Sequence, residues 1–448
     1  MVSMIRRVSA EAAGGGEAVA VLGRVLGPAV GEAVAACGAR ERRRRKLPAA
    51  LVLLLCVAAH WYGADPLPEV ARRVGAGAAA GKAGLCRARY RRGARPLVAL
   101  FRRVCRPLAT AATPGAFLFG LRLVAVDATT FDLADTPANA RAFGRPRSWR
   151  GPGAWPQAQV VALVECATHA VLDAGLWPCT ADPHAGARRL LRSVGRLMLV
   201  LYDRGLHSCR LLGAVRARGA HALGRLPSTV RPEVLRSLAD GTVLVRLRPW
   251  PHRNGGPPVL ARLVRYTLDD PARPGHRAEH RLVTTLLNPA RAPALDLVCA
   301  YHARWEVELA VDEIATHQRP PTPLRSKKPV GVVQELYALL LAHYAVRAAM
   351  ADAAAGAALA PTRLSFLGAL RLVRTALPDL RRAGPRRRAR LYRRLLAAIA
   401  AAPLPPRADR TNPRAVKQKM SNFPLKRPHH RGPPTPARPF RDAVVLLK

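Results

Sequence analysis

Apolar and polar positions alternate in blocks along the chain, and the length of each block predicts the element that it forms. Residues 121–126 and 197–202 are short apolar runs with the length of buried strands. Residues 160–165 and 170–176 predict a hairpin through the four residues between them. A helix is predicted near residues 185–193, before the second buried run. This order of strand, hairpin, helix and strand indicates an α/β fold with a mixed sheet covered by helices.

The remaining segments complete the expected domain organisation. Helical periodicity covers 291–318, 331–357 and 363–400, and a strand-like region interrupted by glycine and proline covers about 220–287. The expected units are a disordered N-terminus at 1–16, an N-terminal helical domain at 17–118, an α/β domain at 119–357 with the β-rich stretch at about 220–287 as an insertion, a C-terminal helical region at 358–402, and a basic, proline-rich tail at 403–448.

Two aspartates directly follow the predicted buried strands. Asp127 and Asp203 would therefore lie at strand carboxyl ends, where α/β sheets place their ligands, and Glu308 lies on a predicted helix. Three such acids could hold two Mg²⁺ ions about 3.5–4 Å apart for in-line displacement at phosphorus. Each acid also has a purely structural interpretation. An aspartate between a strand and a helix is often only an N-cap, and a lone helical glutamate is usually solvated.

The net charge favours a polyanionic partner. The chain carries 73 Lys and Arg against 28 Asp and Glu, giving a formal charge of +45. Basic side chains neutralise phosphates and release counterions, so nucleic acid is the natural partner. A GC-rich coding sequence would explain why most of these residues are arginine. It does not explain the shortage of acids, so the nucleic-acid interpretation stands.

The cysteines and the apolar run at 47–59 bear on the cellular compartment. The eight cysteines have no zinc-binding spacing, which favours reduced, buried thiols in a cytoplasmic protein. The apolar run has 13 residues, too few to span a bilayer, so it predicts a buried helix and no membrane association.

A basic segment in the N-terminal region could lie against DNA as a helix. Its arginines are Arg87, Arg89, Arg91 and Arg92. An exposed amphipathic helix without a ligand is the alternative. Trp155, Trp177 and Trp250 could stack on an unpaired base, although core packing is the stronger expectation for each.

Several short motifs, in a fixed order, resemble the DDE transposases of the insertion-sequence type-four family. The motifs are Val126-Asp127-Ala-Thr-Thr130, Asp135-Thr-Pro-Ala-Asn139, Phe143-Gly-Arg-Pro146, Asp203-Arg-Gly205, Tyr301-His-Ala-Arg304-Trp-Glu-Val-Glu308, Thr316-His-Gln318, Leu324-Arg-Ser-Lys327 and Ser421-Asn-Phe-Pro424. The resemblance covers roughly residues 20–435. It implies a ribonuclease-H-like catalytic fold with a β-rich insertion, and an N-terminal domain that recognises transposon ends.

The resemblance also implies the chemistry. Asp127, Asp203 and Glu308 match the family's metal-binding triad, with Mg²⁺ as cofactor and Mn²⁺ as an alternative. The implied function is cut-and-paste DNA transposition, in which one site cleaves the element's ends through a hairpin and joins them to target DNA. The implied partners are double-stranded DNA, as terminal inverted repeats and target, and a second copy of the chain bound to the same DNA.

One position departs from the family's tyrosine–arginine–glutamate–lysine signature. Tyr301 and Arg304 match its first two positions as phosphate-binding residues, but Ala315 stands where the lysine is expected. On a continuous helix at about 100° per residue, positions 301, 304, 308 and 315 share one face. Arg319 would return to this face and could replace the lysine, and Arg325, Lys327 and Lys328 are other candidates. Otherwise the chain would be an impaired copy that binds DNA without cutting it.

Overall fold

The computed structural model describes residues 26–39, 47–63, 65–73, 81–148, 151–249, 257–273, 275–319, 322–405 and 438–447. The chain forms two compact units that interleave along the sequence. The first comprises Met1–Phe117, Leu123–Ser193 and Trp305–Leu404, and the second comprises Leu118–Arg122, Val194–Arg304 and Pro405–Lys448. The expected disordered segment at 1–16 lies outside the described residues.

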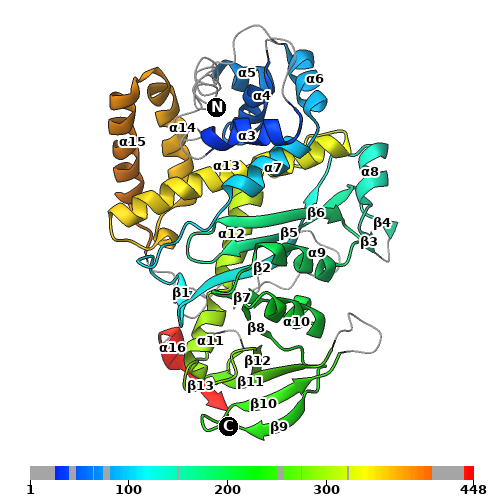
Figure 1. The fold of residues 1–448 in the computed structure, drawn as a ribbon, viewed down its shortest axis with the longest axis vertical. Coiled ribbons are helices and arrows are strands. Elements are labelled where there is room, and N and C mark those ends of the chain that lie inside the picture. Colours follow the sequence, from blue (N-terminus) through cyan, green and yellow to red (C-terminus); the bar gives the residue numbers. More distant parts are fainter. Residues whose placement is uncertain are drawn as a thin grey trace. The chain divides into compact units, whose positions relative to one another are not determined.

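Helices make up the N-terminal part of the first unit. They are α3 (Gly27–Ala36), α4 (Ala49–Ala58), α5 (Leu67–Arg73), α6 (Lys82–Arg92) and α7 (Arg95–Val104). Nine of the ten residues of α4 are buried, which confirms the prediction of a buried helix in the apolar run. The Trp61 indole after α4 donates to the Ala342 carbonyl at 3.1 Å. This contact ties the N-terminal helices to the long helix α13 (Pro329–Gly356), which crosses the upper part of Figure 1.

Helix α13 is the core of the first unit. It is long and apolar enough to cross a membrane by length and composition alone, but 78% of its apolar window is buried inside the protein. Two further helices, α14 (Phe366–Arg382) and α15 (Pro385–Ala400), pack beside it after the short turn η4 (Pro361–Arg363). The predicted helical stretch at 363–400 is therefore two helices, because Gly384 and Pro385 begin a new one.

The strands of the first unit form an antiparallel sheet in the order β6-β5-β2. These are β2 (Leu121–Asp132), β5 (Gln157–Glu165) and β6 (Val171–Pro178), with the short β1 (Phe117–Leu118) paired to β2. The predicted hairpin is confirmed by β5 and β6. Helix α9 (Pro183–Leu190) and the turn η1 (Leu191–Ser193) follow, with α9 packed against both hairpin strands. Helix α8 (Pro137–Phe143) and the small ribbon of β3 (Arg147–Ser148) and β4 (Gly151–Pro152) lie between β2 and β5 in the sequence.

The second unit contains the remaining strands, in the order β7-β8-β12-β11-β10-β9. They are β7 (Met198–Tyr202), β8 (His221–Arg225), β9 (Glu233–Ser237), β10 (Val243–Leu247), β11 (Val259–Leu268) and β12 (His280–Thr284). Strands β7 and β8 are parallel, and the pairs β8–β12, β12–β11, β11–β10 and β10–β9 are antiparallel. Turn η2 (Arg204–Leu206) and helix α10 (Cys209–Ala217) follow β7, and α11 (Ala294–His302) follows β12. The two units together show the mixed α/β class with a mixed sheet and flanking helices.

Two predicted segments differ from the structure. The expected tail ends in α16 (Phe440–Ala443) and β13 (Val444–Leu447), and β13 pairs antiparallel with β11. The last residues of the tail thus form regular structure, while 406–437 lie outside the described residues. The predicted helix at 291–318 is broken: α11 ends at His302, α12 spans Trp305–Asp312, and a π-helical turn, η3, spans Glu313–His317.

Candidate catalytic site

Asp203 lies where the sequence predicts, directly after strand β7. Residue 224 on the neighbouring strand must be glycine, because an added Cβ there would come within 2.1 Å of the buried Tyr202 ring. This close approach fixes the end of β7. The Asp203 carboxylate also accepts a hydrogen bond from the Leu206 amide at 3.1 Å, so it caps η2 as well. Capping and a role in catalysis are therefore compatible for this residue.

Asp127 lies in the middle of a strand and not at its end. Strand β2 continues for five residues to Asp132, and Asp127 pairs opposite Ala162 on β5. Its Oδ1 accepts a hydrogen bond from the Ala128 amide at 2.9 Å. The strand-end prediction was wrong because Thr129, Thr130 and Phe131 are strong strand formers that extend β2 past the acid.

Tyr301 and Arg304 lie near each other in the second unit, and the charge of Asp203 acts on Tyr301. Tyr301 is on α11, and burial first, then the negative charge of Asp203, raises the pKa of its hydroxyl, against opposing effects of Arg304 and Arg225. Arg304 is 8% exposed, and its guanidinium carbon lies 5.9 Å from the Tyr301 ring centroid. A guanidinium beside an acid and a phenol can bind a phosphate next to a cation held by that acid.

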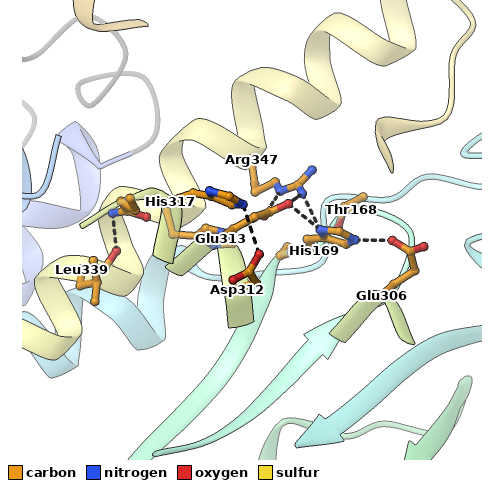
Figure 2. Close-up of polar contacts among 11 residues, drawn as sticks. Thr168, His169, Glu306, Asp312, Glu313, His317, Leu339 and Arg347 are labelled. Carbon is orange, nitrogen blue, oxygen red and sulfur yellow. Dashed lines mark hydrogen bonds and ion pairs between the residues drawn. The ribbon is translucent and has the colours of Figure 1, made fainter. Parts of the chain in front are cut away.

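Glu308 is half-buried on α12, in the first unit. Acidic residues before and after it in the sequence belong to a buried polar network (Figure 2). Glu306 and Glu313 stand two residues before and five residues after it. His169, in the β5–β6 turn, has its Nε2 at 2.6 Å from Glu306 and its Nδ1 at 3.0 Å from Glu313. The network thus attaches both ends of the Glu308 segment to the hairpin turn.

The second half of the network comes from α13. Arg347 contacts Glu313 through two of its nitrogens, with Nε at 2.8 Å, and also contacts Nδ1 of His169. His343 approaches the same carboxylate at 3.0 Å. Burial alone would raise the pKa of Glu313, but Arg347 and then His169 hold that pKa well below its usual range.

Sequence reasoning missed this network. Its contacts join residues 30 to 178 positions apart in the chain, so no local pattern reveals them. One backbone feature marks it: His169 is a non-glycine residue with a positive φ of 57° and a fully buried ring.

The expected phosphate-binding face at 301, 304, 308 and 315 does not survive the helix break. Its geometry assumed one continuous helix, whereas a turn separates α11 from α12 and Ala315 lies in the π-helical turn. Arg319 follows that turn, where its guanidinium donates to the Ala315 carbonyl at 3.3 Å and lies 5.7 Å from the Phe131 ring centroid. Arg319 lines a pocket of about 380 Å³ together with Trp61 and Arg374.

The four arginines of α6 do not act alike. Arg89 donates to the Gln334 side chain at 3.0 Å, to the Ser326 hydroxyl at 2.6 Å and to the Gly331 carbonyl at 2.6 Å, all within the first unit. These contacts engage Nε and Nη2 of Arg89 inside the protein, and its assignment to DNA stays a prediction. Arg92 donates to the Ala39 carbonyl at 3.2 Å. Arg87 and Arg91 are exposed.

The tryptophans also differ from expectation. Trp155 is 44% exposed, so the core-packing interpretation was wrong for it. The Trp177 ring is half-buried and packs so closely over Gly175 that an added Cβ would lie 2.1 Å from it. Trp250 lies outside the described residues.

The carboxylates of the predicted triad are divided between the two units, with Asp127 and Glu308 in the first and Asp203 in the second. Among the described residues, no three His, Cys, Asp or Glu side chains are grouped closely enough to hold a metal ion. The chemistry of the donors nevertheless suits Mg²⁺, because all three are carboxylates on defined elements, none fully buried.

Comparison with known proteins gives consistent matches over most of the chain. The family profile described as "Transposase DDE domain" matches residues 118–345, and that described as "Insertion element 4 transposase N-terminal" matches residues 17–102. The chain is 30% identical over 413 residues to the transposase InsG for insertion sequence element IS4 of Escherichia coli (strain K12), covering 90% of this chain and 93% of that protein. It is 27% identical over 195 residues to InsZ of the same strain, provisionally named as a transposase, covering 42% of this chain and 63% of that protein.

Proposed function

The chain belongs to the insertion-element-4 family of DDE transposases, and from this membership we propose that Asp127, Asp203 and Glu308 bind the metal ions of its DNA-cleaving site. The observation that carries the proposal is the position of Asp203. This acid directly follows β7, whose last residue Tyr202 packs over Gly224, and its charge acts on the nearby hydroxyl of Tyr301. The proposal requires the first unit to supply Asp127 and Glu308 to the same site.

In this proposal each residue near Asp203 has a distinct task. The carboxylates would hold Mg²⁺ or Mn²⁺, and the chemistry that such ions supply is activation of the attacking oxygen and stabilisation of the leaving one. Arg304 would bind the phosphate flanking the scissile bond, and Tyr301 would donate a hydrogen bond to it. The substrates would be the element's ends and then the target DNA, with two copies of the chain bridging two ends in the cytoplasm.

We further propose that the N-terminal helices recognise the element's ends. The family profile named for the transposase N-terminal region covers them, and Arg87 and Arg91 are exposed four residues apart on α6. Residues four apart on a helix share a face, so both could contact the same stretch of DNA.

The alternative is a copy that binds DNA without cutting it. Ala315 favours it, because a methyl group cannot bind the phosphate that the signature lysine would hold. Arg319, whose guanidinium donates to the Ala315 carbonyl, is the nearby cation that would replace the lysine.

The triad is tested by neutral substitution of each acid. We expect a loss of metal-dependent cleavage of the element's ends, by about a hundredfold or more, in each of Asp127→Asn, Asp203→Asn and Glu308→Gln. Residues that bind the metal directly affect its binding at least as much as the residues that orient them. DNA binding should persist. Asparagine caps helices as well as aspartate does, so Asp203→Asn keeps the η2 cap and removes only the charge.

Matched controls come from acids on the same elements. Asp132→Asn on β2 and Asp312→Asn on α12 change exposed carboxylates and should leave cleavage unchanged. Asp182→Asn changes another capping aspartate, at the start of α9. If a triad variant cleaves as well as these controls, its assignment is wrong. If the parent chain binds the ends but never cleaves them, and Ala315→Lys restores cleavage, the DNA-binding alternative is correct.

A further inference from the structure

Helix α15 presents a face made almost entirely of arginine. Between residues 366 and 400 the chain carries ten arginines and one acid, Asp379. Five arginines of α15 are exposed: Arg386, Arg387, Arg390, Arg393 and Arg394. At about 100° per residue they fall within an arc of roughly 120°. They form one continuous surface, which we call the arginine face.

The opposite side of α15 is already used for packing. Tyr392, Leu395 and Ile399 are buried, and α15 packs against α13 and α14. The Tyr392 hydroxyl donates to Asp352 of α13 at 3.0 Å. Because the apolar side is occupied, α15 cannot insert that side into a lipid bilayer. Only the arginine face is available to a partner.

Nothing in the described part of the chain neutralises the arginine face. Arg388, which lies outside the arc, donates to the carbonyls of Leu380 and Ala383 at the end of α14. For the five exposed arginines, in contrast, no hydrogen bond or ion pair joins any of them to another described residue. With 28 acids against 73 basic residues, a second copy of the chain would repel this face, so its partner is a polyanion.

The arrangement is unfavourable for an isolated helix. Arg386 and Arg387 stand in the first turn, where the helix dipole disfavours positive charge, and Arg386, Arg390 and Arg394 repeat at four-residue spacing, where like charges repel. The N-cap, Gly384, makes no side-chain hydrogen bond to the first turn. A bound anion would relieve all three effects.

We propose that the arginine face binds the sugar–phosphate backbone of duplex DNA without reading its sequence. From Arg386 to Arg394 the face extends about 12 Å, at 1.5 Å per residue, and duplex DNA presents roughly seven phosphate charges over that length. Helix α15 contains no Asn, Gln, Ser or Thr to read base edges alongside these arginines. The proposal rests on the DNA chemistry of the family but not on the assignment of the metal site or of the end-binding helices.

The test is the salt dependence of binding to a random-sequence duplex of about 30 base pairs, measured with the full chain in EDTA so that cleavage plays no part. The triple variant Arg386→Gln, Arg390→Gln and Arg393→Gln should lose up to about 2.7 units of the log–log salt slope, at about 0.9 per phosphate contact. The same three positions changed to lysine should keep most of the slope, because the charge remains.

The matched control removes three exposed arginines that already have carboxylate partners. Arg246 and Arg248 pair with Glu233, and Arg265 pairs with Glu279. Changing these three to glutamine removes the same formal charge and should change the slope by less than about one unit. Thermal unfolding of the α15 variant should be unchanged or raised, since it removes repulsion within a helix, so a loss of binding would not reflect misfolding.

Three outcomes would overturn the proposal. The α15 variant could keep the parent's slope, or the two glutamine variants could lose equal amounts, which would indicate net charge alone. The loss could also be confined to an RNA duplex or to anionic phosphatidylserine vesicles, assayed in parallel. Because the random duplex requires neither metal nor element ends, failure here would leave the proposed catalytic and end-binding residues untouched.

Discussion

The interior of the first unit and its helix α15 use the same side chain in opposite ways. Arg347 is buried, and Glu313 and His169 surround its guanidinium. The five arginines of the arginine face on α15 are exposed and have no partner among the described residues. Removing a partner of Arg347 leaves a buried charge unpaired, whereas removing one of the exposed arginines of α15 relieves repulsion between like charges. The interior arginine should therefore control stability and its pH dependence, and the exposed ones should control binding and its salt dependence.

The strongest test of this contrast is Glu313→Gln. It leaves the Arg347 charge buried without its carboxylate, which typically costs about 3–5 kcal/mol of unfolding free energy. Urea denaturation would measure the loss. Asp312→Asn, next to it but exposed, should change stability by less than about 0.5 kcal/mol. Equal effects of the two substitutions would show that the network does not stabilise the fold.

Lowering the pH should decrease the stability that the interior contributes before it affects α15. Burial lowers the pKa of His343, and burial likewise lowers the pKa of His60 to about 4. Histidines with depressed pKa values stabilise the fold fully above the unfolded value of about 6.5, and this contribution is lost as pH falls. Stability should drop by roughly 1–3 kcal/mol between pH 6.5 and 4.

Below about pH 4.3, protonation in the unfolded state also removes the contribution of Glu313, whose folded pKa is depressed. Urea titrations at several pH values would follow both phases. His60→Gln should flatten the first phase without altering the second. A stability that stays constant from pH 7 to 4 would contradict the burial of these histidines.

The smallest expected effect compares two arginines on one helix. Arg89→Gln should cost about 1–3 kcal/mol of stability, because it leaves the buried side chain of Gln334 without its charged partner. Arg87→Gln should leave stability unchanged and weaken binding to the element's ends. Thermal unfolding and gel-shift titration of both variants would separate the roles. If Arg89→Gln instead weakened DNA binding and left stability unchanged, Arg89 would belong to the DNA-binding surface.

How far the sequence could predict the fold depends on whether the signal was local. The hairpin of β5 and β6 and the strand before Asp203 were recognisable because apolar runs of that length form few structures other than buried strands. The orientation of the Arg89 side chain toward the protein interior could also have been predicted from the sequence. Arg89 stands four residues after the buried Leu85 and directly after the buried Ala88, on the apolar side of α6.

The rest of the site depends on distant contacts. No glycine or proline marks the break between α11 and α12, and the π-helical turn begins at Glu313, whose carboxylate is held by residues of the hairpin turn and of α13. Local helix propensity therefore predicts a continuous helix, and tertiary packing overrides it. The placement of Asp127 failed for a simpler reason: the strand was predicted to end with the apolar run at Val126, whereas β2 continues to Asp132.

The pairing of β13 with β11 has a consequence for synthesis on the ribosome. The partner residues Arg265 and Leu447 are separated by most of the second half of the chain. At about 5–20 residues per second, the edge of β11 would wait roughly 10–35 seconds for its last neighbour. During that time an exposed strand edge can pair with another chain. A nascent transposase thus passes through a stage at which crowded polysomes favour aggregation, and a truncated message would leave that edge open permanently.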